Sequence, residues 1–360
     1  MISRRNAVKS VAAGFGTLFS LAASSKPSDA GRGLTTRFTR LVGCTIPIQQ
    51  AGMGSASPPE LAAAVSEAGG LGMVGTARPG INLQTLATLL RETRALTSRP
   101  FGVNFIAREG SLVAHSPGEA IGMAAEHARV VEFFYTEPNA DFVALVHQRG
   151  ALVSWQVGSR AEALKAAQVG CDLIVAQGIE AGGHVRGTVG TLDLLCDVVG
   201  AVPNIPILAA GGITTGRSMA SAIAAGADGV RVGTRFVASE EAGVHRTYTE
   251  ALIAAEAEDS MYTRTFYVGW PEAPHRVLRQ AIDAANASHV EFVGARMGLD
   301  GVERKIPRFA AAVADKSTTG NVAAMSLYAG QGVGAIRSQM RARDIVQKMA
   351  NEAESVLSRL

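Results

Sequence analysis

The chain has 360 residues, of which 40 are glycine, and hydrophobic residues make up 47% of it. This composition excludes an intrinsically disordered protein, and the length suits one large α/β domain, or one domain with a small appendage, around a substantial core. The formal net charge is +3. Arg4, Arg5, Lys9 and Lys26 against Asp29 account for this excess, so the rest of the chain carries no basic footprint for nucleic acid.

Residues 1–30 are typical of an export signal. The basic segment SRRNAVK is followed by the apolar run VAAGFGTLFSLAA and by the polar segment SSKPSDA, which is the order of parts in a signal peptide. The paired arginines resemble a twin-arginine signal, although Ala7 stands where a bulky residue is usual. The expected location is the periplasm, with the twin-arginine export machinery as a partner, and the alternative is a cytoplasmic protein with a frayed N-terminus. No apolar run reaches the length of a membrane span.

The cysteines are Cys44, Cys171 and Cys196, and no two of them form a CxxC pair. An odd number without such a pair predicts neither a disulfide framework nor a metal site. Cys171 opens an expected strand and Cys196 lies in an expected helix, and we interpret both as small core residues.

Eight short apolar segments predict strands. They lack strict alternation, which favours strands buried on both faces, as in parallel sheets. Helical patterns that end in glycine separate most of them. The segments are residues 47–53, 71–75, 101–106, 130–136, 151–157, 171–177, 205–212 and 229–234.

Eight alternating units predict an α/β fold of the (β/α)8, or TIM, barrel type, with additional helical elements from the C-terminal third. We assign the main part of the barrel to residues 31–240, and barrel closure with helical elaboration packed on the barrel to residues 241–360. The alternative is an open, doubly wound sheet, but no GxGxxG motif follows the first strand.

Two glycine loops predict a phosphate site. Gly211 and Gly212 follow the seventh expected strand, and Gly233 and Thr234 follow the eighth. In such barrels these two loops commonly bind phosphate, because glycine lets backbone N–H groups approach the anion. No P-loop is present, so we interpret the phosphate as the handle of a cofactor.

His184 follows the sixth expected strand and the glycine pair Gly182 and Gly183. An imidazole at the end of a barrel strand could act as a base near neutral pH. Three amides, Asn104, Gln156 and Gln177, lie in or at the end of strands, where they could hydrogen-bond a polar heterocycle. The alternative for each amide is a structural role, and for His184 a solvated loop position.

Several of these segments resemble the nitronate monooxygenase family, formerly called 2-nitropropane dioxygenases. The segments are PIQQAGMG, GVNFI, AQGIEAGGHVRGTVG, ILAAGGI, GVRVGTRF and YAGQGVG, and the likeness spans about residues 44–345. The resemblance implies a TIM barrel that contains FMN and oxidises alkyl nitronates, or nitroalkanes, with O2 to a carbonyl compound and nitrite.

The resemblance also implies roles for particular residues. His184 would lie over the flavin, as the catalytic base for neutral nitroalkanes and as a partner for the nitronate. The expected flavin and phosphate contacts, with no metal ligand among them, are Ala51, Gly52, Met53, Asn104, Gln177, Gly182, Gly183, Gly211, Gly212, Gly233 and Thr234. Gln156 has no firm counterpart and stays a possible flavin contact.

Three alternatives remain open. An FMN-dependent NAD(P)H reductase, of the enoyl-ACP reductase or quinone reductase type, would share the same scaffold. An enzyme similar to IMP dehydrogenase would need a nucleophilic cysteine after a central strand, and here that loop offers His184. A flavin or phosphate carrier without activity would need the glycine pairs and not the histidine.

Overall fold

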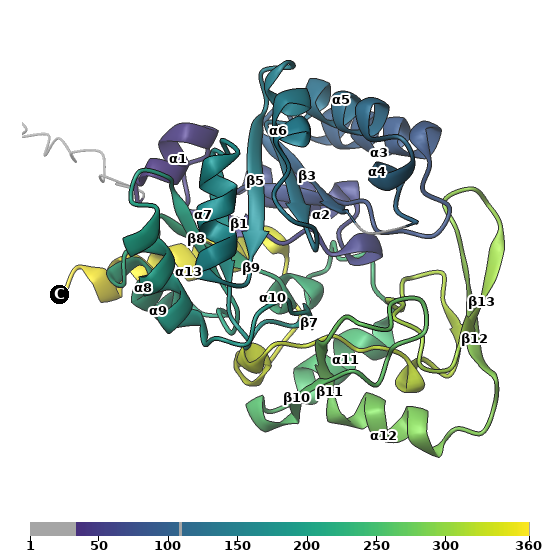
Figure 1. Ribbon diagram of the computed structural model, residues 1–360. Coiled ribbons are helices and arrows are strands. Elements are labelled where there is room, and N and C mark those ends of the chain that lie inside the picture. Colours follow the sequence, from purple (N-terminus) through teal and green to yellow (C-terminus); the bar gives the residue numbers. More distant parts are fainter. Residues whose placement is uncertain (1–33, 108–109, 360) are drawn as a thin grey trace, which may run out of the picture. The chain divides into compact units, whose positions relative to one another are not determined.

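The computed structural model describes residues 34–107 and 110–359. The expected export signal, residues 1–30, lies outside the described residues. The described chain forms one compact unit, and in it eight parallel strands form a single sheet in the order β1-β9-β8-β6-β5-β4-β3-β2 (Figure 1). The strands are β1 (Ile48–Gln50), β2 (Gly72–Gly75), β3 (Phe101–Ile106), β4 (Val130–Phe134), β5 (Leu152–Val157), β6 (Leu173–Gln177), β8 (Ile207–Ala210) and β9 (Gly229–Val232).

The two ends of this sheet meet. Gln49 and Leu71 form a parallel bridge between β1 and β2, and the backbone N–H of Gln50 donates to the Leu71 carbonyl at 2.9 Å. The sheet is therefore a barrel, which confirms the predicted (β/α)8 fold and excludes the open sheet. All eight strands lie within the segments that the sequence predicted.

Helices follow most of the strands, and capping side chains fix where several of them begin. Asn82 and Thr215 each form a capping box at the start of α3 and α9, and such boxes satisfy backbone N–H groups that the helix leaves free. The helices of this part are α1 (Arg37–Val42), α2 (Pro59–Glu67), α3 (Leu83–Leu96), α4 (Leu112–His115), α5 (Pro117–His127), α6 (Ala140–His147), α7 (Arg160–Gln168), α8 (Thr191–Ala201), α9 (Gly216–Ala224) and α10 (Thr234–Val237), with the 3-10 turn η1 (Gly54–Ala56).

One end of the barrel is filled by apolar side chains. Phe38 and Val42 of α1 form a buried cluster with Leu71, Val130 and Leu173, which lie where β2, β4 and β6 begin. Helix α1 therefore covers the N-terminal ends of the strands. The opposite end, where the strands finish, is the end at which ligands bind in such barrels.

The chain after β9 forms a second layer of structure. Strands β10 (Ser260–Thr263) and β11 (His275–Leu278) make a small antiparallel sheet with β7 (Gly183–His184), the two-residue strand of the loop after β6. A second small sheet joins β13 (Glu303–Pro307), β12 (Phe292–Met297) and β14 (Thr319–Gly320). The other elements are α11 (Arg246–Ala254), α12 (Arg279–Ala287), η2 (Ala257–Asp259), η3 (Val322–Ala324) and η4 (Gln331–Ala335).

The last helix, α13 (Ala342–Leu357), packs against α9 and α2 (Figure 1). The backbone N–H of Gly216 donates to the Glu352 carboxylate at 2.8 Å, and the Gln347 amide donates to the Ala68 carbonyl at 3.0 Å. A Cβ atom on Gly216 would lie 2.4 Å from the Met349 carbonyl oxygen. Glycine at this position therefore allows the two helices to approach closely.

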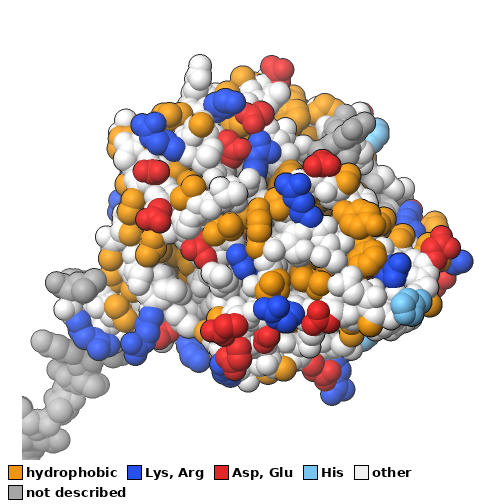
Figure 2. Space-filling view, turned by 60° about the horizontal axis from the view of Figure 1, so that its bottom comes forward, with side chains coloured by type: hydrophobic (Ala, Val, Ile, Leu, Met, Phe, Trp, Pro, Cys, Tyr) orange, Lys and Arg blue, Asp and Glu red, His pale blue; other side chains and the backbone are white. Residues whose placement is uncertain are grey.

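One face of the protein's surface mixes side chains of all kinds. Basic, acidic and hydrophobic side chains are interspersed on the face shown in Figure 2.

Cys171 is buried as expected, whereas Cys196 is exposed, so the core position expected for Cys196 is wrong. The buried stripe of α8 runs through Leu194, Leu195 and Val198, which leaves Cys196 on the outer face. Within the described residues, no helix is long and apolar enough to cross a membrane.

Candidate active site

A cavity of about 440 Å³ lies at the C-terminal ends of the barrel strands. It collects side chains and backbone from the loops that follow β1, β3, β6, β8 and β9. Every residue for which the sequence suggested a site role lines it, namely Ala51, Gly52, Met53, Asn104, Gln156, Gln177, Gly182, Gly183, His184, Gly211, Gly212, Gly233 and Thr234. Residues spread over the sequence from 51 to 234 are thus brought to one space.

Glycine backbones form one side of this cavity. Gly211 and Gly212 have φ angles of +119° and +67°, which residues with a Cβ rarely adopt. A Cβ atom on Gly182 would lie 2.4 Å from the backbone nitrogen of Gly330, whereas one on Gly183 would meet nothing within 4 Å. The chain therefore passes close to the YAGQGVG segment at Gly182, and at Gly183 it leaves open space.

Amide side chains line the barrel interior below the cavity. The Asn104 amide donates to Glu132 Oε1 at 2.9 Å, and the Gln177 amide donates to the His184 carbonyl at 3.1 Å. The Gln177 Oε1 atom is buried and accepts no hydrogen bond from a described residue. A buried acceptor without a donor is costly, so this atom indicates the position of a ligand donor.

An ion pair that the sequence analysis did not identify lies beside these amides. Arg231 Nη1 and Glu132 Oε1 are 2.6 Å apart, and the two side chains are 6% and 0% exposed. Glu132 also accepts hydrogen bonds from Gln49 and Ser154, and Arg231 donates to Gln156. Burial lowers the pKa of Arg231 and the Glu132 charge opposes this shift. A charged residue in each of the apolar segments VVEFFYT and GVRVGT was the available signal.

His184 lies against aromatic rings from distant segments. Its ring centroid is 4.0 Å from that of Trp270, 5.4 Å from that of Tyr328 and 6.2 Å from that of Tyr135. Pairing of β7 with β11 fixes the His184 backbone. Tyr135 has a φ of +68°, and strain of this kind in a non-glycine residue clusters at functional sites. The sequence analysis missed these three aromatic residues, two of which come from the irregular chain after β9.

His275 is the histidine that adjoins His184, with a centroid separation of 5.5 Å. Its Nε2 accepts from the Phe266 N–H at 3.2 Å, and its Nδ1 lies 3.0 Å from the Ala273 carbonyl. These partners assign the proton to Nδ1. Burial lowers the pKa of His275, so the neutral form is favoured. With both nitrogens engaged, His275 has a positioning role for the strand that holds His184.

The described lining of the cavity carries positive charge, mainly from Arg78 and Arg296, because Glu132 behind the lining pairs with Arg231. It includes Arg78, Arg231 and Arg296, and it contains no aspartate or glutamate. Arg78 donates to the Gly75 and Ser57 carbonyls at 2.9 and 2.6 Å, and burial lowers its pKa to about 10. A desolvated cationic cavity favours an anionic ligand.

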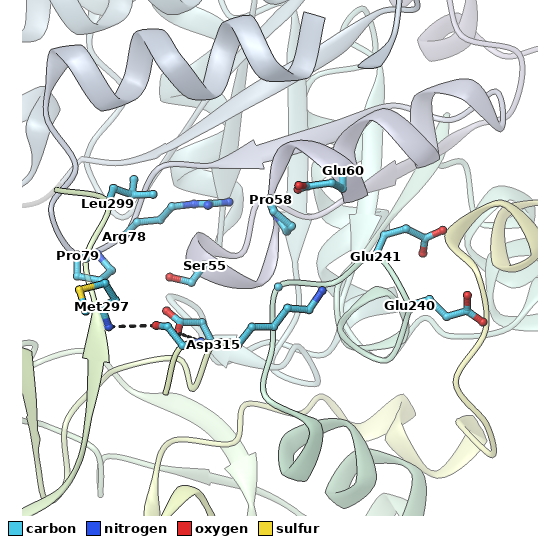
Figure 3. A pocket seen from close by; sticks show the side chains of 14 residues that line it. Ser55, Pro58, Glu60, Arg78, Pro79, Glu240, Glu241, Met297, Leu299 and Asp315 are labelled. Carbon is cyan, nitrogen blue, oxygen red and sulfur yellow. Dashed lines mark hydrogen bonds between the residues drawn. The ribbon is translucent and has the colours of Figure 1, made fainter. Parts of the chain in front are cut away.

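A second cavity, of about 530 Å³, adjoins the first and shares Arg78 and Pro79 with it. Figure 3 shows Arg78 and Asp315 on one side of it and Glu240 and Glu241 on the other, with Glu60 also on its wall. Its described lining includes Gly243 and Gly298 but none of the predicted site glycines and no histidine. The residues to which the sequence analysis gave site roles therefore line the first cavity and not the second.

Comparison with known proteins agrees with this geometry. Residues 35–352 match the family model described as nitronate monooxygenase. The chain is 35% identical to a nitronate monooxygenase of Pseudomonas aeruginosa, over 64% of this chain and 77% of that protein.

Two further relatives carry other names. A Rhodococcus jostii protein named (3aS,4S,5R,7aS)-5-hydroxy-7a-methyl-1-oxo-octahydro-1H-indene-4-carboxyl-CoA dehydrogenase is 35% identical, over 79% of this chain and 76% of that protein. The structure of FabK from Thermotoga maritima superposes with a TM-score of 0.74 at 30% identity, covering 90% of this chain and 98% of that one. The chain therefore belongs to the nitronate monooxygenase family and is an oxidoreductase.

Proposed function

We propose that the protein binds FMN in the 440 Å³ cavity and oxidises alkyl nitronates with O2 to a carbonyl compound and nitrite. Neutral nitroalkanes are proposed as a second class of substrate. One observation carries the proposal: glycine backbones from three strand ends, His184 and three arginines line the same cavity, whose described lining contains no carboxylate.

The fit to a flavin phosphate is supported by the backbone. Gly211 and Gly212 follow β8 and Gly233 and Thr234 follow β9, the seventh and eighth strands of the barrel. Loops in these places bind phosphate in many barrels. Thr234 Oγ1 accepts the Gly330 N–H at 3.0 Å, which leaves its hydroxyl proton to donate to an anion.

The fit to a flavin ring is supported by the buried amides. Gln177 Oε1 requires a donor, and an isoalloxazine offers a ring N–H. A Cβ atom on Gly52 would lie 2.3 Å from Asn104 Cβ, so the Ala51–Met53 segment packs directly on the Asn104 side chain beside the ring site. When bound, the flavin supplies the redox chemistry, and the protein supplies binding, orientation and charge.

His184 is proposed to manage the substrate proton. For a neutral nitroalkane, the α C–H bond breaks, its electron pair stays on the substrate as the nitronate, and the imidazole takes the proton. For a nitronate, the protonated imidazole would pair with the anion. Trp270 and Tyr328, whose rings lie 4.0 and 5.4 Å from that of His184, limit the space beside the imidazole and exclude water from it.

The test is spectroscopic. The purified protein should be yellow, or become so when reconstituted with FMN, and ethylnitronate should reduce the flavin under anaerobic conditions. Admission of O2 should then yield acetaldehyde and nitrite. A colourless preparation that does not take up FMN would contradict the proposal.

A second candidate is an FMN-dependent dehydrogenase or NAD(P)H reductase on the same scaffold. The carboxyl-CoA dehydrogenase name of the Rhodococcus jostii relative favours it. Anaerobic mixing separates the two candidates. Rapid bleaching of the flavin by NADH or NADPH, with no response to ethylnitronate, would favour the reductase.

We also propose export to the periplasm through the twin-arginine route, on the basis of residues 1–30 alone. A route that carries folded proteins suits a protein that acquires its cofactor in the cytosol. Cell fractionation tests this proposal, with a variant in which Arg4 and Arg5 are both replaced by lysine. Equal cytoplasmic retention of both forms would contradict it.

A further inference from the structure

Arg296 enters the cavity from β12, outside the barrel. Its Nη1 donates to the Val313 carbonyl at 2.9 Å. Among the described residues, Arg296 has no ion-pair partner, because no carboxylate oxygen lies within 4.0 Å of its guanidinium. Burial lowers the pKa of Arg296, while Asp315 and Tyr328 act in the opposite direction. Asp315 itself is engaged by Ser317 and Thr318.

The other two arginines of the cavity have stronger local partners. Arg231 is paired with Glu132 at 2.6 Å, and Arg78 donates to two backbone carbonyls. Arg296 has one such carbonyl, although a guanidinium offers five N–H donors. A partly buried guanidinium with so few partners keeps several N–H groups unmatched by the chain, so its charge is positioned for an anion that comes from outside the chain.

Tyr328 provides a second donor close by. Its hydroxyl is buried and makes no well-formed hydrogen bond with a described residue; the nearby Ser326 hydroxyl donates to the Ala312 carbonyl instead. Burial raises the pKa of Tyr328 to about 12, while the neighbouring Ser326 hydroxyl and the charge of Arg296 oppose this shift, so the hydroxyl keeps its proton and can donate. The Tyr328 ring also lies 5.4 Å from that of His184. Tyr328 therefore lies beside the imidazole, and Arg296 is near enough to Tyr328 to interact with it electrostatically.

We propose that Arg296, together with the Tyr328 hydroxyl, binds a planar anionic group with two oxygen atoms on the substrate. The guanidinium fork matches such a group in a bidentate manner. A nitronate and a carboxylate share this shape, and the assignment to the nitronate rests on the proposed function. The anion site itself rests only on the geometry of the cavity.

Nitrite is the probe, because it presents two oxygen atoms on one nitrogen. Binding of sodium nitrite and of sodium acetate to the purified holoprotein is measured by titration calorimetry, for the natural protein and for Arg296→Gln, Arg296→Lys and Tyr328→Phe. Lys305→Gln is the matched control. It also removes one positive charge, and Lys305 is exposed on the strand that pairs with β12, opposite the residue before Arg296.

We expect Arg296→Gln to weaken nitrite binding about tenfold or more, as loss of a charged hydrogen bond does. Arg296→Lys should be intermediate, Tyr328→Phe should weaken binding by a smaller factor, and Lys305→Gln should leave it unchanged. In turnover, Arg296→Gln should raise KM for ethylnitronate with little change in kcat, the pattern of lost uniform binding.

Unchanged nitrite affinity in folded Arg296→Gln and Tyr328→Phe would overturn the inference. If Arg296→Gln does not fold, Arg296→Lys and Tyr328→Phe carry the test. Tighter binding of acetate than of nitrite, with the same dependence on Arg296, would overturn the nitronate assignment. Arg296-dependent nitrite binding without any nitronate turnover would contradict the proposed function and support the anion site.

Discussion

His184 and His275 are opposite residues of the antiparallel strands β7 and β11, and their ring centroids lie 5.5 Å apart. Although they are paired, the two histidine side chains have different surroundings. His275 is fully buried and hydrogen-bonded at both nitrogens, whereas His184 lines the cavity. We therefore propose His184, and not His275, for the proton chemistry, and a positioning role for His275 through the strand that pairs with β7.

Replacement of His184 by asparagine should abolish turnover of neutral nitroalkanes and keep the flavin. The amide cannot act as a base, and loss of a general base lowers rates roughly 100- to 10,000-fold. The measurement is kcat for nitroethane, with the bound flavin quantified from its visible absorbance. The kcat for ethylnitronate, which needs no deprotonation, should fall by a smaller factor. Full activity in flavin-loaded protein would remove His184 from the mechanism and favour a different base.

The protein should lose stability in mild acid through His275. Its pKa in the folded state lies below the ordinary 6.5 because of burial. The unfolded chain therefore binds a proton more readily, and the stability contributed by neutral His275 is complete above about pH 6.5 and is lost as the pH falls towards the lower value. Urea unfolding between pH 7.5 and 5 measures the free energy. His275→Asn should flatten this dependence, while His289→Asn, at an exposed position, is the control.

The adjacent glycines Gly182 and Gly183 should respond differently to alanine. In Gly182→Ala the new methyl group meets the backbone of Gly330, and overpacking of this kind costs about 1–3 kcal/mol, so both stability and flavin content should fall. In Gly183→Ala the methyl group meets no protein atom, and its φ of +79° costs roughly 1–2 kcal/mol.

Thermal unfolding and flavin absorbance separate these effects. Gly183→Ala should lose more flavin for a given loss of stability, because its methyl group occupies the open space of the cavity. Gly200→Ala, in the last turn of α8 with no atom near its Cβ position, is the control. Equal flavin content in all three variants would contradict a flavin site at these glycines.

Neutralising one partner of the barrel ion pair should destabilise the fold. Glu132→Gln leaves Arg231 as a buried charge without a counter-ion, and such losses cost about 3–5 kcal/mol. Glu126→Gln is the matched control, because Glu126 pairs with Arg149 where both side chains are largely exposed, and surface pairs contribute about 0–1 kcal/mol. Urea unfolding of both variants gives the comparison. A similar small effect for the two would show that the barrel interior tolerates an uncompensated arginine.

The barrel strands were predictable because each is a short, nearly continuous apolar run between glycine-ended helices. Strands such as β4 and β6 are buried along their whole length. Because both faces of such a strand are buried, it appears in the sequence as a nearly continuous apolar run, which can be recognised without knowing the fold. The convergence of the glycine loops was predictable too, since the ends of parallel strands meet at the same rim. The roles of the residues in those loops remain proposals.

The aromatic side of the cavity could not be predicted from sequence. Strand β7 has only two residues and pairs with β11, about ninety positions later, which no local pattern reveals. Trp270 and Tyr328 lie in irregular segments whose place is set by that pairing. Arg231 and Glu132 were visible as charges in apolar strands, but their partnership depends on which side chains point into the barrel. The prediction of this part of the cavity was limited mainly by the large sequence separation of the contacting residues, and less by weak secondary-structure propensity.

The packing of α13 bears on when the protein can fold. This helix rests on α2, which follows the first barrel strand, and on α9, which follows the seventh. Residues 342–357 are synthesised after all eight barrel strands, so the nascent chain cannot complete these contacts until this helix has left the ribosome. Closure is therefore expected only after α13 has emerged, and a polypeptide cut short before residue 342 should remain a target for proteolysis.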